Sequence, residues 1–272
     1  MKITYLGTAA AEGMPAVFCN CEFCRQARAL GGKNIRTRSQ TLINDDLLID
    51  LPADTYSHLL TNGIEGDRIR YLFMTHSHPD HLYPLELEMR QGVAAHEMRV
   101  EKLRVFCGRG VYDKLESQVH NRLGFEVTQI KAFETVCVDG YEVTALPARH
   151  FDGDDALFYV IKGDKTLLYA HDTGFFYEEV FEYFRKNSLY FDMLSLDCTN
   201  VDIPIPDQGS HMGLENIERL MARLTQMGMI DEKTVSYINH FSHNANPLQH
   251  VLEERVKGMG LQVAYDGLSI SI

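Results

Sequence analysis

The stretch that decides the fold is Thr75-His76-Ser77-His78-Pro79-Asp80-His81, which follows the apolar run Arg70–Met74. It brings three histidines and a carboxylate into six residues of a chain that has 12 histidines in 272 positions. Neutral imidazole is the commonest side-chain ligand of Zn, Mn and Fe, and an Asp adds a hard anionic oxygen. A solvated polar turn rarely holds so many imidazoles, so this loop is predicted to bind metal.

The conformation of this loop follows from strand geometry. Alternate residues of a strand point to opposite faces, so these four side chains can converge only if the stretch turns. Pro79 supports a turn, and we expect a helix to begin near Asp80. The same context, a polar residue after an apolar strand, recurs at His150, Asp172 and His240. Loops at strand ends are where functional sites are usually assembled.

Composition limits the class of protein. The chain is 45% apolar and carries 26 basic against 38 acidic residues, for a net charge of −12. It can bury a full core, and its charge disfavours binding to nucleic acid, for which we find no Lys/Arg run. We see no signal peptide and no apolar stretch of the roughly 18 residues that a membrane span needs. The six cysteines therefore indicate thiols or metal ligands, and a cytoplasmic protein is expected.

Short apolar runs alternate with amphipathic stretches along the chain. The predicted strands are Lys2–Gly7, Leu47–Leu51, Arg70–Met74, Leu103–Cys107, Glu142–Leu146, Leu157–Lys162, Thr166–Ala170, Met193–Asp197, Thr234–Asn239 and Gln262–Tyr265. The predicted helices are Glu22–Leu30, Ala53–Asn62, Leu82–Gln91, Val111–Leu123, Phe176–Lys186, Leu214–Met227 and Pro247–Lys257. This order predicts an α/β (α+β) protein with two sheets flanked by helices. Candidate site residues run from position 19 to 243 with no linker between them, so residues 1–272 are expected to form a single domain.

The whole pattern resembles the metallo-β-lactamase superfamily. The resemblance rests on His-x-His-x-Asp-His at 76–81, a lone His150, Asp172 in His171-Asp172-Thr173-Gly174 and a final His240. The Gly7-Thr8 pair also resembles the opening loop of that superfamily, although such a pair is a weak signal. The resemblance implies an αβ/βα four-layer sandwich of two mixed β-sheets, with the site at one edge of both sheets.

The resemblance also implies two metal ions in the active site. It assigns His76, His78 and His150 to one ion and Asp80, His81 and His240 to the other, with Asp172 bridging both. Redox di-iron relatives have a carboxylate where this chain has His78. The histidine trio therefore favours Zn or Mn and hydrolysis, and both metals accept this donor set.

Charge counting indicates the kind of substrate. Two divalent ions bring four positive charges, and Asp80, Asp172 and a bridging hydroxide return three negative ones. The remaining positive charge favours a small anionic substrate such as a phosphodiester, attacked by hydroxide shared between the metals. In this mechanism Asp80 takes or orients the proton of the nucleophile.

A second cluster, Cys19-Asn20-Cys21-Glu22-Phe23-Cys24, supplies three thiols, one ligand fewer than tetrahedral zinc requires. His243 is a natural fourth ligand, and the alternative is three reduced thiols without metal. This cluster resembles the cyclic phosphodiesterases of the carbon–phosphorus lyase (phosphonate degradation) pathway, in which such residues hold one structural zinc. It is also similar to the B proteins of pyrroloquinoline quinone biosynthesis. Superfamily relatives often dimerise, so the resemblance allows a homodimer.

Two further residues have less certain roles. His211, in a Gly/Ser-flanked loop, is a candidate general acid or phosphate-oxygen donor, or else a loop histidine near a helix cap. Asp50 either orients a liganding imidazole, as the resemblance suggests, or caps a turn. His171 is expected to be structural, and His58, His96, His120 and His250 to be solvated on helices. Cys107, Cys137 and Cys198 are expected in the core.

The leading hypothesis is therefore a metal-dependent phosphodiesterase for small phosphodiesters, and the resemblance supplies the cyclic substrate. One alternative keeps the site but cleaves a lactone, thioester or β-lactam. Another is a non-hydrolytic biosynthetic protein like the quinone-cofactor relative, for which a single catalytic iron would be expected. A ribonuclease of transfer-RNA maturation is disfavoured because the chain is acidic.

Overall fold

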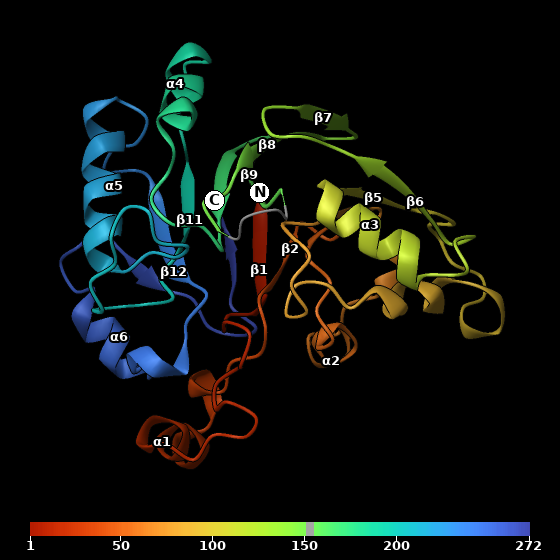
Figure 1. Cartoon of the computed structure of the whole chain (residues 1–272), viewed down its shortest axis with the longest axis horizontal. Helices are drawn as coiled ribbons and strands as arrows, with labels where there is room; N and C mark the ends of the chain where they lie inside the picture. The colour runs from red at the N-terminus through yellow and green to blue at the C-terminus, as the bar shows by residue number, and fades with distance from the viewer. Residues whose placement is uncertain (151–154) are drawn as a thin grey trace.

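The computed structural model describes residues 1–150 and 155–272, which form two seven-stranded sheets packed face to face (Figure 1). The first sheet has the order β14-β1-β2-β3-β4-β5-β6, and the second has the order β13-β12-β11-β10-β9-β8-β7. Both sheets are mixed: β3 to β6 and β10 to β13 run parallel, and the remaining neighbours pair antiparallel. This is the fold class that the sequence predicted.

The strands of the first sheet are β1 (Lys2–Gly7), β2 (Gln40–Ile43), β3 (Leu47–Ile49), β4 (Tyr71–Phe73), β5 (Leu103–Cys107), β6 (Phe125–Gln129) and β14 (Ser269–Ser271). Those of the second are β7 (Thr135–Val138), β8 (Tyr141–Pro147), β9 (Leu157–Lys162), β10 (Thr166–Ala170), β11 (Met193–Asp197), β12 (Val235–Asn239) and β13 (Gln262–Val263). The α-helices are α1 (Glu22–Leu30), α2 (Thr55–Thr61), α3 (Arg109–Gln118), α4 (Glu178–Lys186), α5 (Leu214–Gln226) and α6 (Gln249–Arg255).

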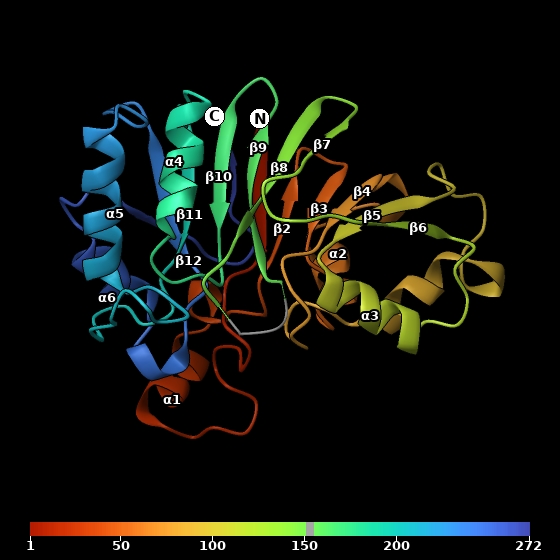
Figure 2. The ribbon, with the colours of Figure 1, turned by 45° about the horizontal axis from the view of Figure 1, so that its top comes forward.

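Helices cover the outer face of each sheet, so the molecule has four layers (Figures 1 and 2). Helices α4, α5 and α6 pack on the second sheet, and α2 and α3 pack on the first. A third apolar cluster, which includes Ile3, Phe73 and Tyr159, fills the space between the sheets. Because central strands are buried on both faces, they are almost continuously apolar, which is why the sequence revealed them.

The four strands that the sequence analysis missed carry more polar residues. β6, β7 and β14 lie at or next to sheet edges and expose alternate side chains. β2 is central but begins with Gln40, whose amide donates to the carbonyl of Asp50 and to the hydroxyl of Thr55. A buried amide with partners of this kind is stable in a core, but hydrophobic patterning cannot predict it.

Two expectations about individual side chains were wrong. His58 is buried, because its ring bonds to Gln40 Oε1 and Thr37 Oγ1, each at 2.6 Å. Cys137 lies on the exposed side of β7, which the alternation of a strand gives to every second residue, whereas Cys107 and Cys198 are in the core as expected. Within the described residues, no helix has both the length and the apolar content needed to cross a membrane.

Candidate metal centre

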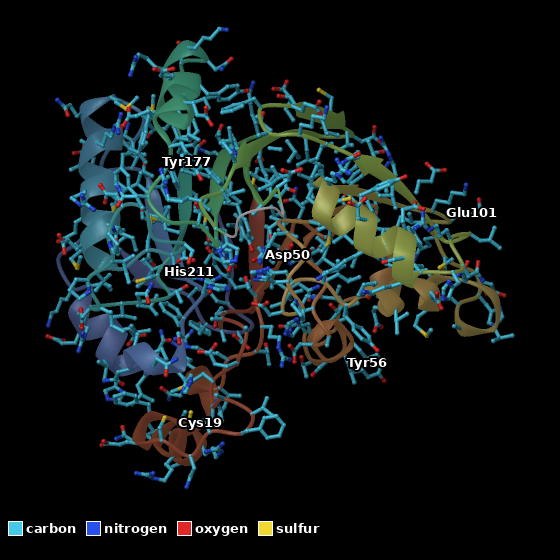
Figure 3. The ribbon with its side chains drawn as sticks, in the orientation of Figure 1. Cys19, Asp50, Tyr56, Glu101, Tyr177 and His211 are labelled. Carbon is cyan, nitrogen blue, oxygen red and sulfur yellow. The ribbon has the colours of Figure 1, made fainter. Side chains whose placement is uncertain are left out.

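The site lies where strands of both sheets end at one edge. The loop 75–81 follows β4, and His150, Asp172 and His240 come just after β8, β10 and β12. Figure 3 shows Asp50, which follows β3, and His211 on either side of the area where these strands end. The sheets therefore bring together every strand-end residue that the sequence predicted.

The loop 75–81 turns as expected, but no helix begins at Asp80. Leu51 bonds to the backbone on both sides of Leu82, with its N–H on the His81 carbonyl at 2.8 Å and its carbonyl on the Tyr83 N–H at 2.7 Å. This strand-like pairing keeps residues 81–83 extended, and a 3₁₀-helix begins only at Pro84 and runs to Arg90. Asp80 and His81 thus belong to the turn rather than to a helix N-terminus.

The orientation of the imidazoles is set by hydrogen bonds at Nδ1. The Nδ1 partners are Thr75 Oγ1 for His76 (3.0 Å), Asp50 Oδ2 for His81 (2.7 Å), Ser210 O for His150 (3.2 Å) and Thr199 Oγ1 for His240 (2.9 Å). At His76, His81 and His240 this bond leaves Nε2 without a hydrogen-bond partner, whereas His150 Nε2 lies 3.1 Å from His78 Nδ1. Each bond also fixes the plane of its ring. A hydrogen bond at the second ring nitrogen is the arrangement found around histidines that ligate metals.

The donor atoms converge in two groups. One ligand atom each from His76, His78 and His150 lie within 4.8 Å of one another, and so do those of Asp80, His81 and His240. Asp172 lies between the groups, with Oδ2 at 2.9 Å from Nε2 of both His81 and His240 and Oδ1 at 3.7 Å from Nε2 of His150. The resemblance implied this division, but the donors also form overlapping groups, one of His76, His81 and Asp172 and one of Asp172, Asp197, His211 and His240.

The centre of the cluster contains buried polar atoms without hydrogen bonds. Four buried atoms have no hydrogen-bond partner: Nε2 of His76, His81 and His240, and Oδ2 of Asp172. Asp172 Oδ2 nevertheless lies close to the rings of His81 and His240. Such orphaned atoms are costly unless a cation completes their coordination. Burial lowers the pKa of His76, and the His240 and His81 rings outweigh the opposing effect of burial to hold the pKa of Asp172 low. Neutral imidazole and ionised carboxylate are the forms that bind metal, so His76 and Asp172 fit divalent ions as they stand. At His81 the charges of Asp172, Asp50 and Asp80 outweigh burial and raise the pKa, so a metal ion there would displace a proton.

Three residues of the site are among the ten non-glycine residues with positive φ in the described part of the chain. Asp50, Asp172 and His240 adopt positive φ angles of 66°, 50° and 62°. Non-glycine residues rarely occupy this region, and such conformations cluster at functional sites because the surrounding structure enforces them. Here each strand end bends into this conformation to aim a side chain at the cluster.

Asp50 hydrogen-bonds His81, the first of the two roles considered for it. Its fully buried carboxylate also accepts from the N–H of Thr75 at 2.8 Å and from the Thr75 hydroxyl. It therefore fixes both His81 and the first residue of the metal loop.

Asp197 is a residue that the sequence analysis missed. Its buried carboxylate accepts from the N–H groups of Asp172 (3.1 Å), Thr199 (3.0 Å) and Met212 (3.0 Å) and from His211 Nδ1 (2.9 Å). It ends the apolar strand β11, in the same way that Asp172 follows β10. That strand-end pattern could have identified it.

His211 lies beside the cluster with its side chain 23% exposed. Burial by itself would lower the pKa of His211, but the charge of Asp197 and its hydrogen bond raise it to about 9. The His211 and His240 rings stack with centroids 5.6 Å apart. The ring can thus present Nε2, protonated, to a ligand at the cluster.

The remaining histidines lie apart from this arrangement. His171 is buried and bonds to Ser195 Oγ at 2.7 Å, which agrees with the structural role predicted for it. His96, His120 and His250 are exposed, although only His250 lies within a helix.

A second cluster joins the N-terminal loop to the loop after β12. Donor atoms of Cys19, Cys21, Cys24 and His243 lie within 4.8 Å of one another, with His243 Nδ1 3.5 Å from Cys24 Sγ and 3.7 Å from Cys21 Sγ. Cys21 caps α1, and the bond from the Cys24 N–H is the largest of the effects that lower the pKa of Cys21 to about 6. Thiolates and imidazole at these positions fit tetrahedral zinc.

Glu12, also missed by the sequence analysis, provides a second connection between the same two loops. Its Oε1 accepts from Ser242 Oγ at 2.6 Å and from the His243 N–H at 3.2 Å. It follows no strand and belongs to no motif, so no local signal marks it.

Two packed mixed sheets with His and Asp donors at one edge define the metallo-β-lactamase fold, a class whose members bind divalent metal ions. The family model described as "Beta-lactamase superfamily domain" matches residues 48–237, so the chain belongs to that family.

Known proteins of this fold include hydrolases and a biosynthetic protein. The chain is 28% identical over 156 residues to coenzyme PQQ synthesis protein B of Bradyrhizobium diazoefficiens, a match that spans 52% of this chain and 48% of that protein. A diphosphatase of the PhnP family superposes with a TM-score of 0.76 at 22% identity, covering 100% of this chain and 97% of that one. Zn²⁺-bound PqqB from Methylobacterium extorquens superposes with a TM-score of 0.70 at 19% identity, covering 100% of both chains.

Proposed function

We propose that the chain is a metal-dependent hydrolase of small phosphodiesters, and of cyclic phosphodiesters in particular. The observation that carries this proposal is the His211–Asp197 pair beside the Asp172 cluster, with Asp197 Oδ2 2.9 Å from His211 Nδ1. A phosphodiester has an anionic phosphoryl group and a poor alkoxide leaving group. It therefore needs both cations at phosphorus and a proton donor at the departing oxygen.

We assign His76, His78 and His150 to one divalent ion, Asp80, His81 and His240 to a second, and Asp172 to both. When bound, two such ions lower the pKa of water and neutralise charge on phosphoryl oxygens. The donor set accepts Zn and Mn alike.

The chain's own groups perform the remaining steps. Asp80, with Oδ2 3.3 Å from His81 Nε2, orients the attacking water or takes its proton. His211 donates its Nε2 proton to the departing alkoxide, while Asp197 holds the ring and stabilises its protonated form. The small anionic substrate enters past His211, whose side chain is partly exposed, whereas His76, His81 and Asp172 are closed off from solvent.

We also propose that Cys19, Cys21, Cys24 and His243 hold one structural zinc. His243 lies three residues beyond His240. A zinc there would fix the loop 19–24 against the loop that carries a ligand of the catalytic centre, which preorganises that ligand.

The test is turnover of bis(p-nitrophenyl) phosphate with Mn or Zn added, beside the matching monoester. We expect diester cleavage with little monoester cleavage. His211→Ala should lower diester turnover by about 100-fold or more at unchanged metal content, since one general acid typically contributes about that much. His250→Ala, an exposed histidine on α6, is the matched control. If the fully metallated protein leaves the diester intact, the proposal is wrong, and unchanged turnover in His211→Ala would remove that residue from the mechanism.

A second candidate is a biosynthetic role like that of the PQQ synthesis protein. The observation that favours it is the sequence match to that protein over 52% of this chain. It predicts no diester cleavage, whatever metal is supplied, and metal analysis would show one catalytic iron. Lactone or thioester hydrolysis at the same site would be tested with the same metal-loaded protein.

A further inference from the structure

A guanidinium is buried where the N-terminal lobe, residues 14–36, meets the end of β1 beside α6 (Figure 1). It belongs to Arg36, which is only 2% exposed, whereas most arginines keep their charge in water. Its Nη1 donates to the Ala264 carbonyl at 2.7 Å and to Thr8 Oγ1 at 2.8 Å, and its Nη2 donates to Gln249 Oε1 at 2.6 Å. Burial lowers the pKa of Arg36 to about 10, so the group is still charged at neutral pH. Removing such a charge from water costs free energy that its partners must offset.

The compensating carboxylate is Asp266, which Arg36 reaches through the hydroxyl of Thr8. Thr8 Oγ1 accepts from Arg36 and donates to Asp266 Oδ1 at 2.6 Å. Asp266 Oδ2 accepts from the N–H of Thr37 at 2.6 Å and from its hydroxyl at 2.5 Å. We call Arg36, Thr8 and Asp266 the Arg36 network. The Thr8 hydroxyl is the link that joins its cation to its anion.

The Gly7-Thr8 pair, a weak signal in the sequence, lies at the end of β1, where this link is made. The side chain of Thr8 is fully buried. A Cβ at Gly7 would lie 1.9 Å from the carbonyl oxygen of Arg38, so the strand can pass this close to the chain after the lobe only with glycine. The pair therefore places a hydroxyl between two charged groups in the interior.

The Arg36 network also holds the turn that carries His240. The guanidinium carbon of Arg36 lies 4.5 Å from the centroid of the Phe241 ring. Phe241 donates its N–H to the Thr8 carbonyl at 3.0 Å, and its carbonyl accepts from the N–H of Ala10 at 3.0 Å. His240, directly before Phe241, has a φ of 62°, a conformation that the surrounding structure must enforce. Both the ring and the backbone of the residue after His240 are thus fixed by this network.

The histidines assigned to the first ion are held by other groups. Nδ1 of His76 bonds to Thr75, and Nδ1 of His150 bonds to Ser210. Within residues 1–150 and 155–272, no hydrogen bond joins these groups directly to the Arg36 network. An indirect path from Asp266 to the carbonyl of Asp50 runs through the side chains of Thr37, His58 and Gln40. The direct influence of the network is therefore on His240.

We propose that Arg36, Thr8 and Asp266 are positioning residues for His240, and that they set the affinity of the second metal ion and not of the first. This inference rests on the proposed function, in which His240 holds the second ion. Nε2 of His240 now lies 2.9 Å from Asp172 Oδ2. Because a metal ligand must be held to within about 0.5 Å, a small shift of Phe241 is enough to weaken the ion's coordination.

The test removes the Thr8 hydroxyl and follows the release of metal. Thr8→Val keeps the size of the side chain but breaks the link between Arg36 and Asp266, whereas Thr8→Ser keeps the hydroxyl. The zinc-loaded full chain is titrated with a chelator, and bound zinc is counted at each step. We expect one catalytic ion of Thr8→Val to bind about 10-fold more weakly, the lower end of the range for residues that orient metal ligands. The other catalytic ion and the zinc of the cysteine cluster should be unchanged, and Thr8→Ser should behave as wild type.

Thr4→Val is the matched control, because it removes a buried hydroxyl of the same strand that bonds to Ser269, away from the site. It should release its zinc as wild type does. Asp266→Asn, which weakens the same link from the other side, should reproduce the effect of Thr8→Val. Circular dichroism checks that each variant is folded.

The ion that is weakened is identified with His78→Ala, which removes a ligand of the first ion. In that variant the remaining catalytic ion should still bind about 10-fold more weakly when Thr8→Val is added. Unchanged release in folded Thr8→Val and Asp266→Asn, equal weakening of both catalytic ions, or a loss that Thr8→Ser shares would each overturn the proposal. Because release is measured without substrate, a chain that holds both ions but leaves diesters intact would refute the proposed function and not this inference.

Discussion

The two donor clusters of this protein are built in opposite ways. Donors of the cluster around Asp172 come from the ends of strands in both sheets, and four of its imidazoles are oriented by a second hydrogen bond. Three of the four donors of the cysteine cluster come from one six-residue stretch on a lobe outside the sheets. The first geometry is held by the two sheets, whereas the second is held by a small apolar core that includes Cys24 and Leu248 and, as we propose, by zinc. The comparison suggests that losing a ligand should mainly cost activity at the first cluster and stability at the second.

The largest effect is expected for Asp172→Asn, which removes the carboxylate that lies between the two groups of donors. Diester turnover should fall by roughly 1,000-fold, and metal content should drop from three ions per chain towards one. The chain should stay folded, because the sheets and the hydrogen bonds at Nδ1 remain, although loss of the two ions lowers the melting temperature to the extent that they stabilise the folded chain. Metal analysis, turnover and thermal denaturation check this, with the exposed Asp45→Asn as control. A collapse in stability would contradict the idea that the fold holds this centre.

At the cysteine cluster, Cys24→Ser should mainly lower stability and leave turnover nearly unchanged. It should lose one metal equivalent and about 3 kcal/mol of unfolding free energy, the contribution expected from a ligand present at roughly 100 times its dissociation constant. The catalytic ions should remain bound. The exposed Cys137→Ser is the matched control. Retention of all three ions in Cys24→Ser would show that the cysteine cluster holds no zinc.

His58 offers a buried imidazole that belongs to neither cluster. Burial lowers its pKa to about 4 from the ordinary 6.5. The unfolded chain therefore binds a proton at this residue at a higher pH than the folded chain, so the stability that His58 contributes is complete above pH 6.5 and is lost as the pH falls towards 4. The loss should reach about 3 kcal/mol. Denaturant unfolding across this range should show a smaller decline for His58→Gln than for wild type, and an equal decline would refute the assignment.

The smallest effect is expected at the connection between the loops. Glu12→Gln weakens the bonds to Ser242 and to the His243 N–H, so the free energy of unfolding should fall by about 1 kcal/mol. Turnover should fall only a few-fold, with the exposed Glu232→Gln as control. A loss of turnover as large as that of Asp172→Asn would mean that the two clusters act as one unit.

Sequence reasoning predicted the strands and ligands for a clear physical reason. A strand buried on both faces is mostly apolar, so runs such as Leu157–Lys162 and Met193–Asp197 were found with their observed bounds. A metal ligand must be a particular side chain, so His76, His78, Asp80 and His81 stand out in the printed sequence. By contrast, β2 was missed because Gln40 is buried by partners that lie elsewhere in the chain.

The sequence by itself determined which chemical groups the site contains, because imidazole, carboxylate and thiolate at these spacings have few other uses. Only the tertiary structure decided how those groups are held. The bonds from Asp50 to His81 and from Asp197 to His211 join residues 31 and 14 positions apart, and Glu12 bonds to Ser242 across 230 positions. Such pairs form because strand ends and loops that are distant in the chain lie side by side in the fold, which the spacing of residues does not show.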